Sequence, residues 1–169
     1  MKALTIVHTG NGKGKSTAAF GLALRAWGDG LRVLILQFIK GQKKSGELIA
    51  REKIGIAIRQ LGLGFSIGDE DQSKHREAAR SAIDVARDEI DSGNWDLIVL
   101  DEINYALKFD LISKEDLLSL LNRNSEVHLV FTGRDACEEL IERADLVTEM
   151  KLVKHPFDKG IKAQIGIEF

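Results

Sequence analysis

Short apolar runs alternate along this chain with segments of helical periodicity. Residues 3–7 (ALTIV) form an apolar run that ends in a glycine-rich loop, and residues 17–27 follow with the composition of a helix. Residues 32–38 (RVLILQF) are almost continuously apolar, which is typical of a strand covered on both faces. The beginning of the chain therefore predicts a strand, a loop, a helix and a second strand of a parallel sheet.

The remainder of the chain continues this alternation. Helices are expected at residues 72–92, which place apolar positions on one face, and at two shorter segments with N-terminal capping signals. These two segments are residues 113–122, where Ser113 and Asp116 form the signal, and residues 135–144, where Asp135 and Glu138 do. Further strands are expected at residues 54–61, 97–100, 127–132, 146–153 and 163–168, the last two flanking a turn at 155–160. The pattern predicts one α/β domain over residues 1–169, with a mostly parallel sheet and helices on both faces.

Composition excludes several classes of protein. The chain has 169 residues, a formal net charge of -2 and a single cysteine, Cys137. An internal disulfide is therefore impossible, no cluster has zinc-ligand spacing, and the weak net charge makes nucleic acid a poor candidate partner. The apolar runs are too short to span a membrane, and the first ten residues lack the apolar length of a signal peptide. We expect a cytoplasmic protein without a membrane partner.

The loop after the first strand carries the strongest chemical signal. It matches the Walker A pattern at its second glycine, lysine and serine, whereas Thr9 occupies the position of the first glycine. Alternate glycines let backbone amides turn toward anionic oxygens, and the following helix adds its positive end. The alternative is a tight turn whose lysines face solvent, and this alternative is strongest for Lys13. The loop predicts an ATP phosphate site formed by Thr9, Gly10, Asn11, Gly12, Lys13, Gly14, Lys15 and Ser16.

A second signal is the apolar strand Leu97–Leu100, which ends in Asp101 and Glu102. This arrangement resembles a Walker B strand, which holds the Mg²⁺ that accompanies nucleotide phosphates. Mg²⁺ needs few protein oxygens because it keeps several waters, so the Ser16 hydroxyl and one of the two carboxylates suffice. The alternative is an ordinary strand that ends in a solvated loop. Paired with the glycine loop, Ser16, Glu102 and Asp101 predict a magnesium site.

Two arginines are further candidates for contact with the nucleotide. Arg134 follows the expected strand at 127–132, where its planar guanidinium would suit a phosphate, although a capping pair with Asp135 is equally compatible with the sequence. Arg25 lies on the first expected helix, where either a surface role or a nucleotide contact is open.

The sequence resembles the P-loop family of ATP:corrinoid adenosyltransferases over essentially its whole length. The threonine at the start of the loop, the QFIKG segment and the GIEF terminus distinguish this family from kinases and motor ATPases. The matching segments are TGNGKGKSTAAFG (9–21), LRAWGDG (24–30), QFIKG (37–41), VLDEINYAL (99–107), TGR (132–134), ADLVTEM (144–150) and KHPFDKGIKAQIGIEF (154–169).

The resemblance implies a RecA-like P-loop NTPase fold and transfer of the 5′-deoxyadenosyl group of ATP to the Co(I) of cob(I)alamin or a related corrinoid, with release of triphosphate. It implies Mg²⁺ held by Ser16 and Glu102, with Asp101 beside them, and ATP bound with its phosphates reversed relative to ordinary P-loop enzymes. It also implies a corrinoid-binding loop at Phe65 and Ile67 in which Phe65 displaces the lower axial ligand, whereas Ile67, where relatives carry tryptophan, can still exclude water. The alternative for Phe65 is a loop aromatic that packs into the core. A homodimer and a flavodoxin-like reductant are further expectations from the resemblance.

Two other classes of protein share the same loop. A phosphohydrolase or kinase would use Glu102 as a base that positions water, and a regulatory module would bind ATP without turnover. Product analysis with Mg·ATP and a reduced corrinoid separates the three, because only the adenosyltransferase forms a Co–C bond and releases triphosphate.

Overall fold

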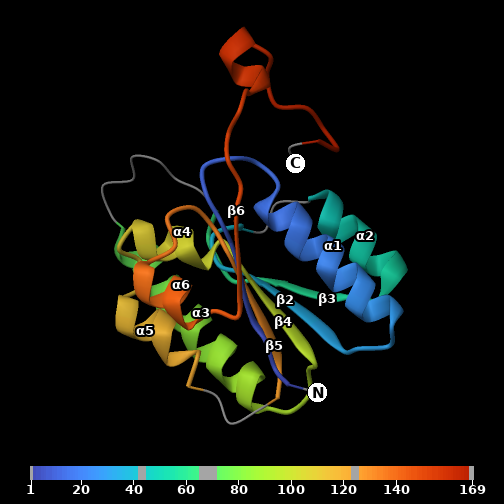
Figure 1. Cartoon of the computed structure of the whole chain (residues 1–169), viewed down its shortest axis with the longest axis vertical. Coiled ribbons are helices and arrows are strands. Elements are labelled where there is room, and N and C mark those ends of the chain that lie inside the picture. The colour runs from blue at the N-terminus through green and yellow to red at the C-terminus, as the bar shows by residue number, and fades with distance from the viewer. Residues whose placement is uncertain (1, 42–44, 65–71, 123–125, 168–169) are drawn as a thin grey trace.

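The computed structural model describes residues 2–41, 45–64, 72–122 and 126–167. Within them, six strands form one sheet in the order β3-β2-β4-β5-β1-β6, and every neighbouring pair is parallel. The strands are β1 (Thr5–Thr9), β2 (Val33–Gln37), β3 (Ala57–Gln60), β4 (Leu97–Asp101), β5 (His128–Thr132) and β6 (Leu146–Glu149). The expected parallel sheet is confirmed (Figure 1).

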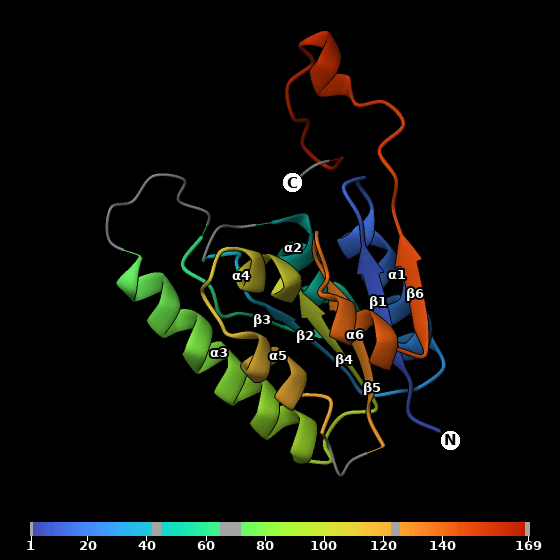
Figure 2. The same ribbon diagram turned by 60° about the vertical axis from the view of Figure 1, so that its left-hand side comes forward.

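Helices cover both faces of this sheet, as the buried strand pattern requires. On one face Ala19 and Ala23 pack with strand residues such as Val99, and on the other Ile83 packs with residues such as Leu100. Figures 1 and 2 show α1 and α2 on the first face and the remaining helices on the second. The helices are α1 (Lys15–Gly28), α2 (Gly46–Ile54), α3 (Ser73–Asp91), α4 (Ile103–Lys108), α5 (Lys114–Ser119) and α6 (Glu138–Arg143).

The register of the sheet brings distant polar residues to one edge. Gln37 at the end of β2 lies opposite Asp101 at the end of β4, and His8 on β1 lies opposite Thr132 at the end of β5. All strands run in the same direction, so their carboxyl ends and the loops that follow them share this edge. In open α/β sheets ligands bind at this edge.

Two helices were not predicted from the sequence. α2 has no buried residue and therefore lacks the apolar stripe that periodicity detects, and it ends at Gly55 in the left-handed conformation. The predicted strand at 54–61 was consequently too long, because Ile54 is the last residue of α2 and β3 begins at Ala57. α4 has only six residues, fewer than two helical turns. The capping box of Ser113 and Asp116 is confirmed.

The end of the chain departs most from the prediction. The strand expected at 146–153 ends at Glu149, and residues 163–167 form no strand. Instead, residues 151–167, here called the C-terminal arm, extend beyond the carboxyl edge of the sheet and include a short 3-10 helix, Pro156–Lys159 (Figures 1 and 2). Ile165 and Ile167 alternate as strand residues would, but their side chains are exposed and have no core to enter. None of the helices in the described ranges is long and apolar enough to cross a membrane.

Candidate active site

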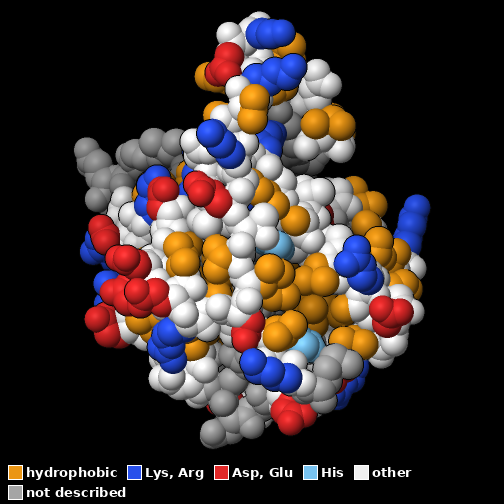
Figure 3. Space-filling view, in the orientation of Figure 1, with side chains coloured by type: hydrophobic (Ala, Val, Ile, Leu, Met, Phe, Trp, Pro, Cys, Tyr) orange, Lys and Arg blue, Asp and Glu red, His pale blue; other side chains and the backbone are white. Residues whose placement is uncertain are grey.

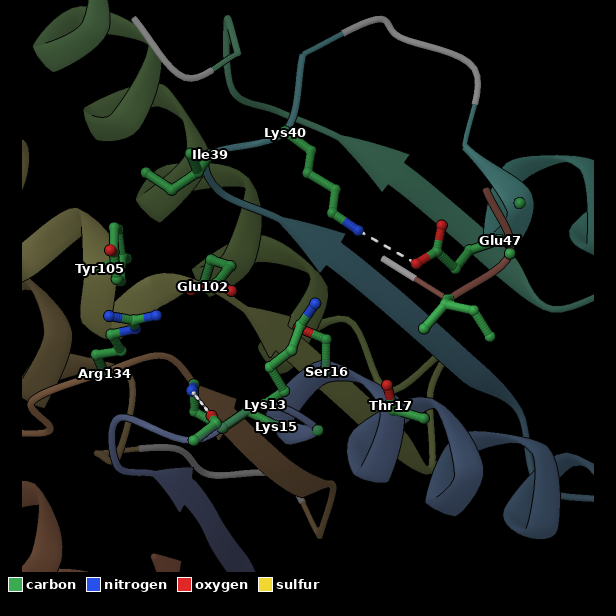
Figure 4. A pocket seen from close by; sticks show the side chains of 15 residues that line it. Lys13, Lys15, Ser16, Thr17, Ile39, Lys40, Glu47, Glu102, Tyr105 and Arg134 are labelled. Atoms are coloured by element: carbon green, nitrogen blue, oxygen red, sulfur yellow. Dashed lines mark hydrogen bonds and ion pairs between the residues drawn. The ribbon is translucent and has the colours of Figure 1, made fainter. Parts of the chain in front are cut away.

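A cavity of about 610 Å³ lies at the carboxyl edge of the sheet, above the start of α1. Residues from six separate segments line it, and Figure 4 shows their side chains converging on one space. These lining residues are Gly12–Thr17 from the glycine loop and α1, Ile39 and Lys40 after β2, Gly46 and Glu47 of α2, Glu102 and Tyr105 around α4, Arg134 after β5, and Gly166 and Ile167 of the C-terminal arm.

Lys15 occupies the centre of the glycine loop. Gly14 precedes α1 with φ 106°, a left-handed conformation that glycine adopts without strain, and this turn aims the first residues of α1 at the cavity. The Lys15 ammonium is buried and donates to the carbonyl oxygens of Gly10 at 2.9 Å and Gly12 at 2.6 Å. Burial lowers the pKa of Lys15, and the nearby Glu102 carboxylate opposes this shift. The loop therefore holds a cation in place at the base of the cavity.

The first half of the loop is held by neighbouring segments and does not line the cavity. The Thr9 hydroxyl accepts from the amide of Ala136, and the Asn11 side chain accepts from the amide of Leu152. A Cβ on Gly10 or Gly12 would lie within 2.7 Å of the carbonyl oxygen of Met150, so both positions need glycine for close packing. Gly12 also donates its amide to that oxygen at 2.6 Å. The geometry thus directs residues 12–17 to the cavity and residues 9–11 to anchoring the loop.

Asp101 is fully buried beneath the cavity and accepts two hydrogen bonds. The Gln37 amide donates to one carboxylate oxygen at 3.0 Å, and the Thr132 hydroxyl donates to the other at 2.8 Å. Sequence reasoning did not single out Gln37 or Thr132, although both lie in segments that carry the family resemblance. The sequence did carry a signal for them, because each is a polar residue at the end of an apolar strand. A buried polar side chain there requires a hydrogen-bond partner.

Glu102 faces the cavity beside Asp101. Burial raises the pKa of Glu102 to about 6, Asp101 adds to this shift, and Lys15, Lys40 and Arg134 oppose it. The Ser16 hydroxyl also lines the cavity, so a hydroxyl and a carboxylate oxygen are available there, and these are the hard ligands that Mg²⁺ prefers. No cluster of three or more His, Cys, Asp or Glu suited to a metal occurs in the described part of the chain. A Mg²⁺ ion that takes its remaining ligands from phosphate and water fits this donor set.

Further charged side chains surround this pair. Arg134 faces the cavity. Asp135, its capping partner in the alternative that the sequence left open, instead forms an ion pair with Lys108 at 2.6 Å. Lys40 enters from the end of β2 and pairs with Glu47 at 3.2 Å across the cavity (Figure 4). Arg25 lies exposed on the last turn of α1 and does not line the cavity. The site thus presents several cations to a ligand, as a triphosphate requires.

The expected corrinoid residues Phe65 and Ile67 lie outside the described residues. The segment that leads to them is described as far as Gly64, whose amide donates to the carbonyl oxygen of Ile39 at 3.0 Å. Gly62 packs so closely on Ile39 that a Cβ would lie 2.4 Å from its carbonyl oxygen. Because Ile39 lines the cavity, the chain enters this segment beside the site.

Comparisons with known proteins find relatives that match nearly the whole chain. The family model described as ATP:corrinoid adenosyltransferase BtuR/CobO/CobP matches residues 1–169. A corrinoid adenosyltransferase of Sinorhizobium sp. is 44% identical over 99% of this chain and 81% of its own length. Those of Pseudomonas aeruginosa and Escherichia coli K12 are 42% and 38% identical, each over 99% of this chain, and over 84% and 86% of their own lengths.

Among solved structures, the RadB recombinase is similar with a TM-score of 0.51 and 18% identity, covering 90% of this chain and 76% of that protein. This likeness concerns the fold alone and confirms the expected RecA-like P-loop architecture. Three relatives that match this chain over 99% of its length are corrinoid adenosyltransferases, and the family model covers every residue of it. The chain therefore belongs to the family of ATP:corrinoid adenosyltransferases.

Proposed function

We propose that the cavity at the carboxyl edge of the sheet is where this adenosyltransferase binds ATP and transfers its 5′-deoxyadenosyl group to the Co(I) centre of a corrinoid. The observation that carries the proposal is the convergence of the glycine loop, Glu102 and Arg134 on one cavity, although they lie far apart in the sequence. In the reaction the cobalt electron pair attacks C5′ of ATP and forms the Co–C bond. The bond from C5′ to the phosphate oxygen breaks, and triphosphate leaves with the electron pair.

In this reaction the protein stabilises the triphosphate leaving group. Lys15, the loop amides of residues 13–16 and Arg134 face the cavity, where they stabilise negative charge that accumulates on the triphosphate. A general base is unnecessary because no proton is removed from the attacking atom. Lys13 and Lys40 add positive charge at the rim. Thr9, Gly10 and Asn11 hold the loop in shape for phosphate binding, and Arg25 stays a weaker candidate for contact with the nucleotide.

Ser16 and Glu102 are the residues that would hold Mg²⁺, with Asp101 behind them. Bound there, the ion neutralises charge on the triphosphate and strengthens it as a leaving group. Both side chains line the cavity, whereas Asp101 is fully buried and already accepts two hydrogen bonds. This burial supports direct coordination by Ser16 and Glu102 and a supporting role for Asp101.

The corrinoid is proposed to bind next to the segment that leaves Gly64. Phe65 is expected to displace the lower axial ligand, and Ile67 to exclude water with less flat surface than tryptophan would offer. Phe65→Ala is therefore expected to slow turnover of cobalamin much more than turnover of a corrinoid that lacks a lower ligand. Equal losses with both substrates would contradict the displacement role.

The assembly is proposed to be a cytoplasmic homodimer that receives its electron from a flavodoxin-like donor. Exposed apolar side chains in the C-terminal arm favour burial by a second copy, with Val153 87% and Phe157 76% exposed. Figure 3 shows hydrophobic side chains both on the arm and over the β6 side of the body. The single cysteine is compatible with a reducing compartment.

The decisive experiment incubates the protein with Mg·ATP and chemically reduced cobalamin and identifies the products. A light-sensitive Co–C bond and one triphosphate per adenosyl group are expected. ADP and phosphate formed without any need for corrinoid would instead assign the site to a phosphohydrolase, and ATP binding without turnover would assign it to a regulatory module. Lys15→Ala should abolish ATP binding or turnover, whereas Lys2→Ala, which alters an exposed lysine, should leave both unchanged.

A further inference from the structure

Glu102 enters the nucleotide cavity because the chain turns at that residue. In β4, Leu97 and Val99 pack on the α1 side of the sheet, and alternation places Asp101 on the same side. A straight continuation of the strand would aim residue 102 at the opposite side. Instead, Glu102 adopts φ 62° and ψ 22°, a left-handed conformation that is uncommon for residues other than glycine, and its side chain lines the cavity.

Hydrogen bonds on both sides of Glu102 hold this turn. Its carbonyl oxygen accepts from the amides of Tyr105 and Ala106, both at 3.1 Å, at the start of α4. Its amide donates to the Thr132 hydroxyl at 2.8 Å, across from β4 to the end of β5. Thr132 is thus the side chain that fixes the amide of a residue in an unfavourable backbone conformation.

The orientation of the Thr132 hydroxyl is itself determined by its neighbours. The hydroxyl donates its proton to Asp101 at 2.8 Å, which leaves a lone pair for the Glu102 amide. The Gln37 amide donates to the other oxygen of Asp101 at 3.0 Å, and Gln60 donates to Gln37 at 3.2 Å. This polar chain spans β3, β2, β4 and β5, and Gln37, Asp101 and Thr132 are completely buried.

We propose that Thr132, oriented by Asp101 and Gln37, is a positioning residue that holds the Glu102 backbone so that its carboxylate faces the magnesium of the bound nucleotide. The proposal rests on the assignment of Glu102 to Mg²⁺ made above. Thr132 acts through Glu102 and not through contact with the substrates. Groups that orient metal ligands in this way commonly change metal affinity by about 10- to 100-fold when they are removed.

The test compares Thr132→Val, which keeps the shape of the side chain and removes the hydroxyl, with Thr132→Ser, which keeps the hydroxyl. Calorimetric titration with ATP is done with and without Mg²⁺, and exchange of the Glu102 amide with deuterium is followed by NMR. For the valine variant we expect affinity for Mg·ATP to fall about tenfold, affinity for metal-free ATP to change less than twofold, and the Glu102 amide to exchange faster. The serine variant should recover wild-type values within about twofold.

Gln37→Met removes the donor to Asp101. We expect it to weaken Mg·ATP binding and to speed exchange of the Glu102 amide, each by a smaller factor than Thr132→Val. It also keeps the proposal testable if the valine variant does not fold. Thr148→Val, an exposed substitution on β6, is the matched control and should change neither readout.

Two outcomes overturn the positioning role. In the first, Thr132→Val folds and retains the wild-type difference in affinity between Mg·ATP and metal-free ATP. In the second, it weakens both forms of ATP equally, as general damage to the cavity would. Glu102→Gln separates this failure from failure of the magnesium assignment. If Mg²⁺ no longer changes the ATP affinity of Glu102→Gln but still changes that of Thr132→Val, the positioning role alone is wrong. If Mg²⁺ still changes the ATP affinity of Glu102→Gln, both assignments are wrong.

Discussion

Glu102 shows how a single residue that lines the cavity can oppose the stability of the fold. Its carboxylate is mostly buried, lies beside a second carboxylate and has a pKa of about 6. In the unfolded chain the same group has its ordinary pKa near 4.5. The folded protein therefore binds this proton more tightly than the unfolded chain does. Tighter binding of this proton adds to the free energy of unfolding. This contribution is fully present below about pH 4.5 and is lost as the pH rises through about 6.

Glu102→Gln is expected to stabilise the nucleotide-free protein at neutral and alkaline pH. The free energy of unfolding at pH 8 should increase by about 1 to 2 kcal/mol, because the variant no longer buries an ionised carboxylate. The difference from wild type should shrink as the pH falls through 6 and vanish below about 4.5. Urea denaturation at a series of pH values without Mg²⁺ measures this.

Glu142→Gln alters an exposed glutamate of α6 and is the control, with little change expected at any pH. A stabilisation by Glu102→Gln that is the same at pH 4 and pH 8 would contradict the proposed origin in ionisation.

At the scale of elements, the segment after β6 helps to shape the glycine loop. The sequence indicated that alternate glycines serve the phosphate site. The structure shows that Gly10 and Gly12 also permit the backbone of Met150 to approach, and that Gly12 donates its amide to Met150. The loop and the end of β6 therefore form one structural unit.

Gly12→Ala and Gly21→Ala should have opposite effects on stability. A Cβ at Gly12 would lie 2.7 Å from a backbone oxygen that cannot move aside easily, so we expect a loss of about 1 to 3 kcal/mol and weaker ATP binding. Gly21 lies within α1 with nothing within 4 Å of the added Cβ, so alanine should stabilise by about 0.5 to 1 kcal/mol. Thermal unfolding and ATP titration measure both effects, and destabilisation by both substitutions would contradict this account.

The elements that the sequence predicted are those whose signal is local. The glycine loop, the strand that ends in Asp101 and the stripe of α3 are each contained in one stretch of chain. The pairing of Gln37 with Asp101 joins residues 64 positions apart, and that of Asp101 with Thr132 joins residues 31 apart. These contacts follow from strand order, which hydrophobic periodicity does not encode. α2 escaped prediction because it buries no residue.

At the scale of the whole molecule, the C-terminal arm is the part that the fold of one chain does not explain. Its side chains are largely exposed, and their apolar alternation led to the wrong prediction of a final strand. Alternation predicts a strand only where one face becomes buried, and here no layer of the described chain covers it. In the proposed homodimer a second copy would supply such a layer.

Substituting the arm should therefore change the oligomeric state. The double variant Val153→Asp and Phe157→Asp is expected to be monomeric in analytical ultracentrifugation at about 10 μM, where the wild-type protein is expected to be dimeric, because charges oppose burial of the apolar patch. Ile49→Asp replaces another exposed apolar residue, on α2, and should not change the oligomeric state. A wild-type protein that is monomeric at this concentration would contradict the proposed assembly.

The two ends of the chain differ in their distance from the site, and this matters for handling the protein. Gly166 and Ile167 line the cavity, whereas β1 begins at the opposite edge of the sheet (Figure 2). We expect a purification tag or fluorescent label fused after the C-terminal arm to begin close to the cavity and to hinder binding there. A label fused before β1 is expected to lie at the far edge of the sheet, which makes the N-terminal side the better attachment point for affinity capture.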